Sequence, residues 1–183
     1  PALTTAHSHA FQRAMRGQAQ RPAAGREDFW SWRGAMYKIA NELTPESIES
    51  ISRVAYRELH RAGVRTVGEF HYVHHQPDGT PYEDRTILSD AVIRAAKAEG
   101  LRIALLRVAY HRAGPGREAE PGQRRFCDPT PDLVMRDIET MRAHLYLATF
   151  LSAAGRYERS VQLIEHVQPW VDEIQQAVYS GLF

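Results

Sequence analysis

Apolar residues recur with a helical period in four stretches of the chain. A helix is predicted from about residue 28 to residue 43, where the apolar positions are Phe29, Trp32, Met36, Ile39 and Leu43. Thr44-Pro45 supplies an N-cap and a proline at the first helical position, so a second helix begins there and ends at Gly63. Two more helices are predicted, over 86–99 and from Thr130-Pro131 through Leu145.

Continuous apolar runs lie between these helices. The runs VRTVGEF (64–70) and LRIALLRVAY (101–110) predict buried strands, and residues 3–9 predict a short extended segment. Helices that separate near-continuous apolar strands are typical of βαβ units and a parallel sheet. Residues 1–141 are therefore predicted to be α/β, with three βα units.

The last part of the chain has a different pattern, because no strand is predicted after residue 110. Residues 142–183 are expected to form a helical, hairpin-like segment. Within it, residues 147–167 follow the spacing of one tetratricopeptide-type repeat. One repeat cannot bury its own apolar face, so two amphipathic helices that pack on a neighbouring element are the simpler interpretation.

Composition and net charge exclude few classes of function. A net charge of +1 gives no general support for binding to nucleic acids or to acidic membranes, and no apolar run reaches the length of a membrane span. Cys127 is the only cysteine and no signal-peptide pattern is present, so we expect a cytoplasmic protein without an internal disulfide. The chain begins with Pro1 rather than Met, and we expect it to be processed, trimmed or a fragment.

The motif His7-Ser8-His9 is a candidate metal site. In an extended segment, residues i and i+2 point to the same side, about 6.5 Å apart between Cα atoms, and two imidazoles can then bind one ion. On a helix the same spacing would point them nearly opposite ways. Two solvated histidines are the alternative, and the motif alone favours that alternative.

The flanking motifs change this balance. HSHAFQRAMRG, FWSWRGAMY, GEFHYVHHQPDGTPYED and GQRRF resemble, in order and spacing, the N-terminal half of the N-formimidoylglutamate deiminases of the amidohydrolase superfamily. The resemblance runs to about residue 126 and more faintly to 141. It implies a (β/α)8 barrel, of which this chain holds the first three βα units, and one divalent metal ion, usually zinc. It also implies hydrolysis of N-formimino-L-glutamate to N-formyl-L-glutamate and ammonia in histidine degradation.

The resemblance assigns roles to five residues. His7 and His9 match the metal ligands of the first strand, and the residues expected to hold the small-molecule substrate are Gln12, Arg33 and Tyr72. An arginine can bind a substrate carboxylate with two parallel hydrogen bonds. Without the resemblance, Arg33 would be better interpreted as a charge on a helix surface that pairs at i,i+4.

Other polar residues receive weaker interpretations. His71 is a possible pocket residue, whereas His74 and His75 are expected to be polar loop residues. Glu69 is interpreted as a buried acid with a partner, with catalysis as the lesser option. Trp30 and Trp32 are expected in the core rather than the pocket, and Cys127 has no predicted role.

The resemblance also implies groups that have no counterpart in this sequence: a third histidine ligand, an acid/base histidine and glutamate, and an aspartate ligand. A (β/α)8 barrel needs about 250 residues, and the chain has 183. We therefore expect a truncated or rearranged part of a deiminase with little activity alone, or a chain that another copy completes. The catalytic acid/base residues stay unassigned. An unpaired sheet edge or the C-terminal helices can support a homo-oligomer.

Two other functions stay open. One is a non-catalytic interaction protein that uses the helical C-terminal segment. The other is a different amidohydrolase specificity, such as a guanine or cytosine deaminase, although the motifs around Arg33 and Tyr72 argue against it.

Overall fold

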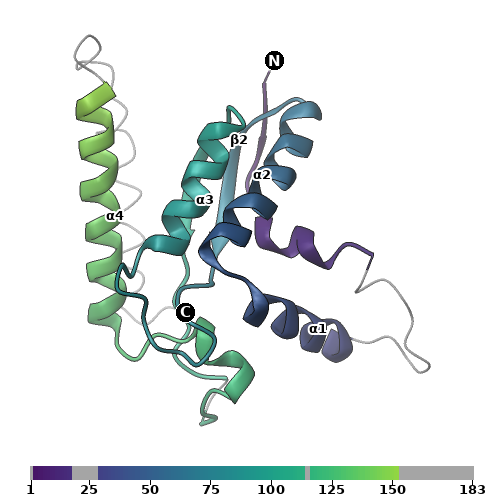
Figure 1. Ribbon diagram of the computed structural model, residues 1–183, viewed down its shortest axis with the longest axis vertical. Helices are drawn as coiled ribbons and strands as arrows, with labels where there is room; N and C mark the ends of the chain where they lie inside the picture. The colour runs from purple at the N-terminus through teal and green to yellow at the C-terminus, as the bar shows by residue number, and fades with distance from the viewer. Residues whose placement is uncertain (1, 18–28, 114–115, 153–183) are drawn as a thin grey trace. The chain divides into compact units, whose positions relative to one another are not determined.

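The computed structural model describes residues 2–17, 29–113 and 116–152 (Figure 1). The chain divides into two units, 1–138 and 139–183. Helix α4 (Pro131–Ser152) begins in the first unit and continues into the second. Most of the repeat-like segment, from residue 153 onward, lies outside the described residues, so the division into 1–141 and 142–183 stays a prediction.

Three strands form a parallel sheet in the first unit, as the sequence predicts. They are β1 (Leu3–Thr5), β2 (Val64–His71) and β3 (Arg102–Arg107), in the order β1-β2-β3. Both neighbouring pairs are parallel. The strands and helices alternate as expected for an α/β fold with three βα units. β1 and β3 are the outer strands of this sheet. Association of two copies through one of these edges stays a prediction.

The helices of the first unit pack on this sheet. Helices α2 (Pro45–Arg61) and α3 (Ile87–Ala98) pack against each other, α2 also against β2 and α3 against β3 (Figure 1). Helix α1 (Phe29–Glu42) packs on the 3-10 helices η1 (Ala10–Met15) and η2 (Pro121–Phe126). Thr44 caps α2 with a capping box, so the predicted start of this helix is confirmed.

The core lies between the sheet and these helices. Alternate side chains of β2 are buried there, and Val67 and Ile48 are fully buried. The opposite face of the sheet is more open, since Phe70 is only partly buried and Leu106 is 42% exposed. Among the residues that the structure describes, no helix combines the length and the apolar character needed to cross a membrane.

The first strand is shorter than the sequence predicts. β1 ends at Thr5, whereas the extended segment was expected to continue to His9. After Thr5 the chain passes close to β2 at Gly68, where a Cβ atom would lie 2.5 Å from the carbonyl oxygen of Ala6. The segment still follows β2, since the Phe70 N–H donates to the Ser8 carbonyl at 2.9 Å.

The segment η2 lies in the loop that follows β3 and was not predicted as a helix. Its Arg125 is fully buried and donates to three backbone carbonyls, two at the end of α1 and one in the loop after β2. Nε donates to His75 at 2.8 Å, Nη2 donates to Leu43 at 2.7 Å, and Nη1 donates to Ala40. The guanidinium thus joins the end of α1 to the loop after β2.

Buried ion pairs hold the end of β3. Arg107 donates to Asp128 at 2.6 Å and to Asp137 of α4 at 2.7 Å, and Arg85 donates to Asp137 at 2.7 Å. Two cations and two carboxylates balance within this network. Although burial alone raises the pKa of Asp128, hydrogen bonds from His75 and Arg107 keep that pKa below its usual range.

Candidate active site

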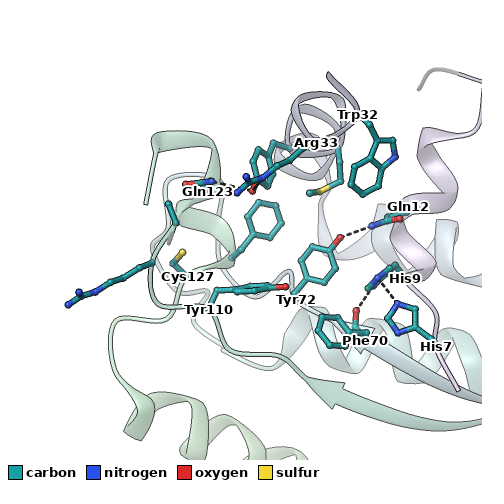
Figure 2. Close-up of a pocket in the computed structure, with 15 residues that line it drawn as sticks. His7, His9, Gln12, Trp32, Arg33, Phe70, Tyr72, Tyr110, Gln123 and Cys127 are labelled. Carbon is teal, nitrogen blue, oxygen red and sulfur yellow. Dashed lines mark hydrogen bonds between the residues drawn. The ribbon is translucent and has the colours of Figure 1, made fainter. Parts of the chain in front are cut away.

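A cavity of about 360 Å³ lies where η1, α1, the end of β2 and the loop after β3 meet (Figure 2). Its size is that of a small-molecule site. All five residues assigned to metal or substrate line it: His7, His9, Gln12, Arg33 and Tyr72. The structure therefore brings together residues that are up to 65 positions apart in the sequence.

The two histidines of the opening motif face each other. Their Nε2 atoms lie 3.0 Å apart, and the Nδ1 atom of His9 lies 2.9 Å from the Phe70 carbonyl oxygen. A carbonyl only accepts, so Nδ1 of His9 carries the proton and Nε2 presents a lone pair. Orientation of an imidazole by a backbone carbonyl is typical of metal-ligating histidines.

Glu69 fixes the turn that follows His9. Its carboxylate accepts the Ala10 N–H at 2.7 Å, at the first residue of η1. The side chain is 1% exposed. Burial raises the pKa of Glu69, and the hydrogen bond from Ala10 opposes that rise. This position agrees with the interpretation of Glu69 as a buried acid with a partner.

Gln12 and Tyr72 form a hydrogen-bonded pair beside the histidines. Nε2 of Gln12 donates to the Tyr72 hydroxyl at 2.7 Å, and Figure 2 shows this contact next to His9. The rings of His9 and Tyr72 meet edge to face at 5.2 Å between centroids. Burial raises the pKa of Tyr72, so its phenol keeps the proton at neutral pH. These four residues, His7, His9, Gln12 and Tyr72, form the imidazole end of the cavity.

A second polar group comes from α1 and η2. Nε of Arg33 donates to the Tyr37 hydroxyl at 2.6 Å, and Nε2 of Gln123 donates to the same oxygen at 3.2 Å. Arg33, Tyr37 and Gln123 form the guanidinium end of the cavity. Figure 2 shows Arg33 and Gln123 together, away from His7 and His9. Arg33 thus pairs at i,i+4 and lines the cavity as well.

The remaining histidines of this region lie elsewhere. His71, predicted as a possible pocket residue, is 1% exposed and is not among the residues that line the cavity. Burial lowers the pKa of His71 to about 3, so it is neutral. His74 and His75 lie in the loop after β2, as expected for polar loop residues, and both side chains are buried, at 2% exposed. Nε2 of His74 lies 2.8 Å from the Val108 carbonyl oxygen, and His75 contacts Asp128.

The imidazole end fits a divalent metal in the nature and spacing of its donors. Two nitrogens that bind one ion at about 2.0–2.1 Å each lie no more than about 4 Å apart, and those of His7 and His9 satisfy this limit. Catalytic zinc sites use three protein ligands. In the described part of the chain no group of three or more histidine, cysteine or acidic side chains can hold a metal. Among the described residues, His7 and His9 are therefore the only two nitrogen donors assigned to a metal, and a third ligand is not found beside them.

Several cavity residues were missed by sequence reasoning. Tyr37 lies four residues after Arg33, a spacing that places both on one face of a helix and could have indicated the contact. Gln123 lies in the GQRRF motif, yet no local pattern brings it to α1. Trp32 and Cys127 also line the cavity, although the sequence assigned Trp32 to the core and gave Cys127 no role.

The chain belongs to the amidohydrolase family. The sequence pattern of the family described as "Amidohydrolase family" matches residues 1–176. The chain is 43% identical over 149 residues to a protein named formimidoylglutamate deiminase from Pseudomonas aeruginosa. This alignment covers 81% of the chain and 33% of the relative.

A solved structure gives the same family. The crystal structure of an amidohydrolase from Brucella melitensis superimposes with a TM-score of 0.74 at 42% sequence identity. It covers 79% of this chain, and the chain covers 32% of it. The chain thus spans about a third of the length of the relatives it matches. The predicted family and the predicted fold class of a partial amidohydrolase barrel are confirmed.

Proposed function

We propose that this chain contributes the first part of the active site of a metal-dependent deiminase. The proposed reaction is hydrolysis of N-formimino-L-glutamate to N-formyl-L-glutamate and ammonia. The carrying observation is that one cavity has an imidazole pair at one end and a guanidinium group at the other. The name of the Pseudomonas aeruginosa relative supports this choice of substrate.

The residues of the imidazole end would act on the formimino group. His7 and His9 would hold one divalent ion, with zinc as the first candidate, and such an ion would supply a bound water of lowered pKa. Phe70 orients His9 through its carbonyl, and Glu69 holds the following turn. The Tyr72 hydroxyl accepts from Gln12 and keeps its own proton, so it can donate to a substrate oxygen or nitrogen.

Arg33 would bind a carboxylate of the substrate. A guanidinium forms paired, charge-assisted hydrogen bonds with a carboxylate, and these are stronger than bonds between neutral groups. Phe126 lies between the two ends, because its ring centroid is 5.4 Å from that of Tyr37 and 5.7 Å from that of Tyr72, and Met36 also lines the cavity wall. The short aliphatic chain of a glutamate derivative suits this wall.

Zinc binding tests the metal assignment directly. Wild-type chain, a His7→Ala/His9→Ala variant and a His60→Ala control are dialysed against zinc, and bound metal is measured by elemental analysis. Loss of groups that only orient a ligand lowers metal affinity by about 10–100-fold, so the double variant should lose at least that much. Near-equimolar zinc that the double substitution leaves unchanged would contradict the assignment.

A chimera tests the reaction. The matched third of the Pseudomonas aeruginosa relative is replaced by this chain, and ammonia release from N-formimino-L-glutamate is measured. We expect activity in the chimera, loss of it in the His7→Ala/His9→Ala chimera, and little activity in the isolated chain. Activity on guanine or cytosine instead of N-formimino-L-glutamate would favour another amidohydrolase specificity.

A further inference from the structure

The hydroxyl of Tyr37 is surrounded by donors. Arg33 donates to it at 2.6 Å and Gln123 donates to it at 3.2 Å. A guanidinium has no acceptor, so the bond from Arg33 can run only toward the tyrosine oxygen. The direction of the second bond depends on how the Gln123 amide is oriented.

A capping box settles that orientation. The Oε1 atom of Gln123 accepts the backbone N–H of Glu120 at 2.9 Å, at the start of η2. The other side of the same amide, which faces Tyr37, is therefore the NH₂ group. The Tyr37 hydroxyl accepts two hydrogen bonds, and a phenol has two lone pairs and one proton. Neither partner can take that proton.

The proton of Tyr37 is thus left for a group in the cavity. Tyr37 lines the cavity and is partly buried. The described residues that line this cavity include Arg33 and Arg112 but no aspartate or glutamate, which suits an anionic acceptor. An adjoining hollow shares Arg33, Tyr37 and Gln123, and there Glu120 is paired with Arg117 at 3.7 Å. The ring of Phe126 contacts both Tyr37 and Tyr72 and so lies between this end and the imidazole end, which suits a carboxylate carried on a short aliphatic chain.

We infer that Tyr37 is a substrate-binding residue whose hydroxyl donates a hydrogen bond to the carboxylate that Arg33 binds. Gln123 is the positioning residue, because its amide donates to the Tyr37 oxygen and so directs the hydroxyl proton toward the cavity. The inference deepens the proposed function and rests on it for the identity of the carboxylate. A hydrogen bond from Tyr37 to a charged carboxylate is stronger than one to a neutral group, so Tyr37 contributes to the preference for an anionic ligand.

Two substitutions separate the donor from the structural support. Tyr37→Phe removes the hydroxyl and keeps the ring, which packs 5.4 Å from the ring of Phe126 between centroids. Gln123→Glu keeps an acceptor for the Glu120 N–H but offers Tyr37 a carboxylate, which takes its proton. Tyr82→Phe is the control, because it removes a phenol hydroxyl from a residue that does not line the cavity. That hydroxyl accepts a long bond of 3.4 Å from Arg125, whose shorter bonds to the Leu43 and His75 carbonyls stay in place.

Binding of glutarate and of its neutral diamide, glutaramide, to the 183-residue chain is measured by calorimetry, with thermal unfolding as a folding check. Wild type and Tyr82→Phe should prefer glutarate. Tyr37→Phe should weaken glutarate binding about tenfold, as expected for loss of a hydrogen bond to a charged group, and change glutaramide binding less. Gln123→Glu should weaken glutarate binding at least as much.

Two results would overturn the inference: a wild-type chain that does not prefer glutarate, or folded Tyr37→Phe and Gln123→Glu variants that keep the wild-type preference. Failure of the proposed function has a different signature. In that case the chimera is inactive on N-formimino-L-glutamate while the preference for glutarate and its dependence on Tyr37 persist.

Discussion

At the imidazole end of the cavity, His7 and His9 lie on the short segment that follows β1 and runs beside the middle strand β2. At the guanidinium end, Arg33 and Tyr37 lie on helix α1, which packs on η2. His7 is exposed, and one backbone carbonyl orients His9. Tyr37 of α1, in contrast, accepts from Gln123, and the end of α1 receives hydrogen bonds from the buried Arg125.

This difference is consistent with the roles proposed for the two ends. Carboxylate binding needs donors held in a fixed direction before the ligand arrives, and the contacts between α1 and η2 provide this. The two histidines of the imidazole end form a pair rather than a closed ligand set, so their positions depend on how the segment after β1 packs along β2. We therefore expect substitutions in the two supports to have separable effects.

The largest effect is expected from Arg125→Met, which removes the support of the guanidinium end. It leaves buried carbonyls without their donors, at a cost of about 1–3 kcal/mol each, although burial of the guanidinium already offsets part of that stabilisation. The net loss of unfolding free energy should be about 2–4 kcal/mol in urea titrations. The exposed neighbour Arg124→Met is the control, and equal losses in both variants would refute this role of Arg125.

A smaller effect is expected at the support of the imidazole end. In Gly68→Ala, the new Cβ would lie 2.5 Å from the Ala6 carbonyl oxygen, so the segment that carries His7 and His9 must shift. Overpacking of this kind costs about 1–3 kcal/mol, and zinc binding should fall further than glutarate binding. At Gly122 a Cβ meets no atom within 4 Å, so Gly122→Ala should change neither. Unchanged zinc binding in Gly68→Ala would show that the close contact between Gly68 and Ala6 does not position His7 and His9.

The smallest effect is a loss of stability at acidic pH, which we expect from His71 at the end of β2. Burial lowers the pKa of His71 to about 3, whereas an unfolded histidine has a pKa of about 6.5. The unfolded state therefore binds the proton first, and stability falls as pH drops below about 6.5. His71→Leu should remove about 1 kcal/mol of this loss between pH 7.5 and 5.5, measured by urea unfolding at both pH values.

His60→Gln should leave that pH dependence unchanged. Glu69, whose pKa is raised by burial, contributes the opposite sign, but it is present in both proteins and cancels in the comparison. An identical pH dependence in wild type and His71→Leu would contradict a neutral, buried His71.

The sheet and its helices could be predicted from the sequence because their signals are local. The apolar run at 64–70 and the Thr44-Pro45 start agree closely with β2 and α2. The burial of His74 and His75 could not be predicted, since it depends on Arg125 and Asp128, which lie about 50 residues further along the chain. Gln123 was missed for the same reason: its contact with Tyr37 spans 86 positions.

The distribution of charge in the cavity has a kinetic consequence. Arg33 and Arg112 line it and no described lining residue is acidic, while the buried pairs around Arg107 cancel one another. The described lining of this cavity is therefore net positive, and under the proposed function we expect its field to accelerate the approach of a dicarboxylate before any contact forms. Added salt screens this field over about 10 Å at 0.1 M, so the association rate falls with ionic strength while the dissociation rate changes little.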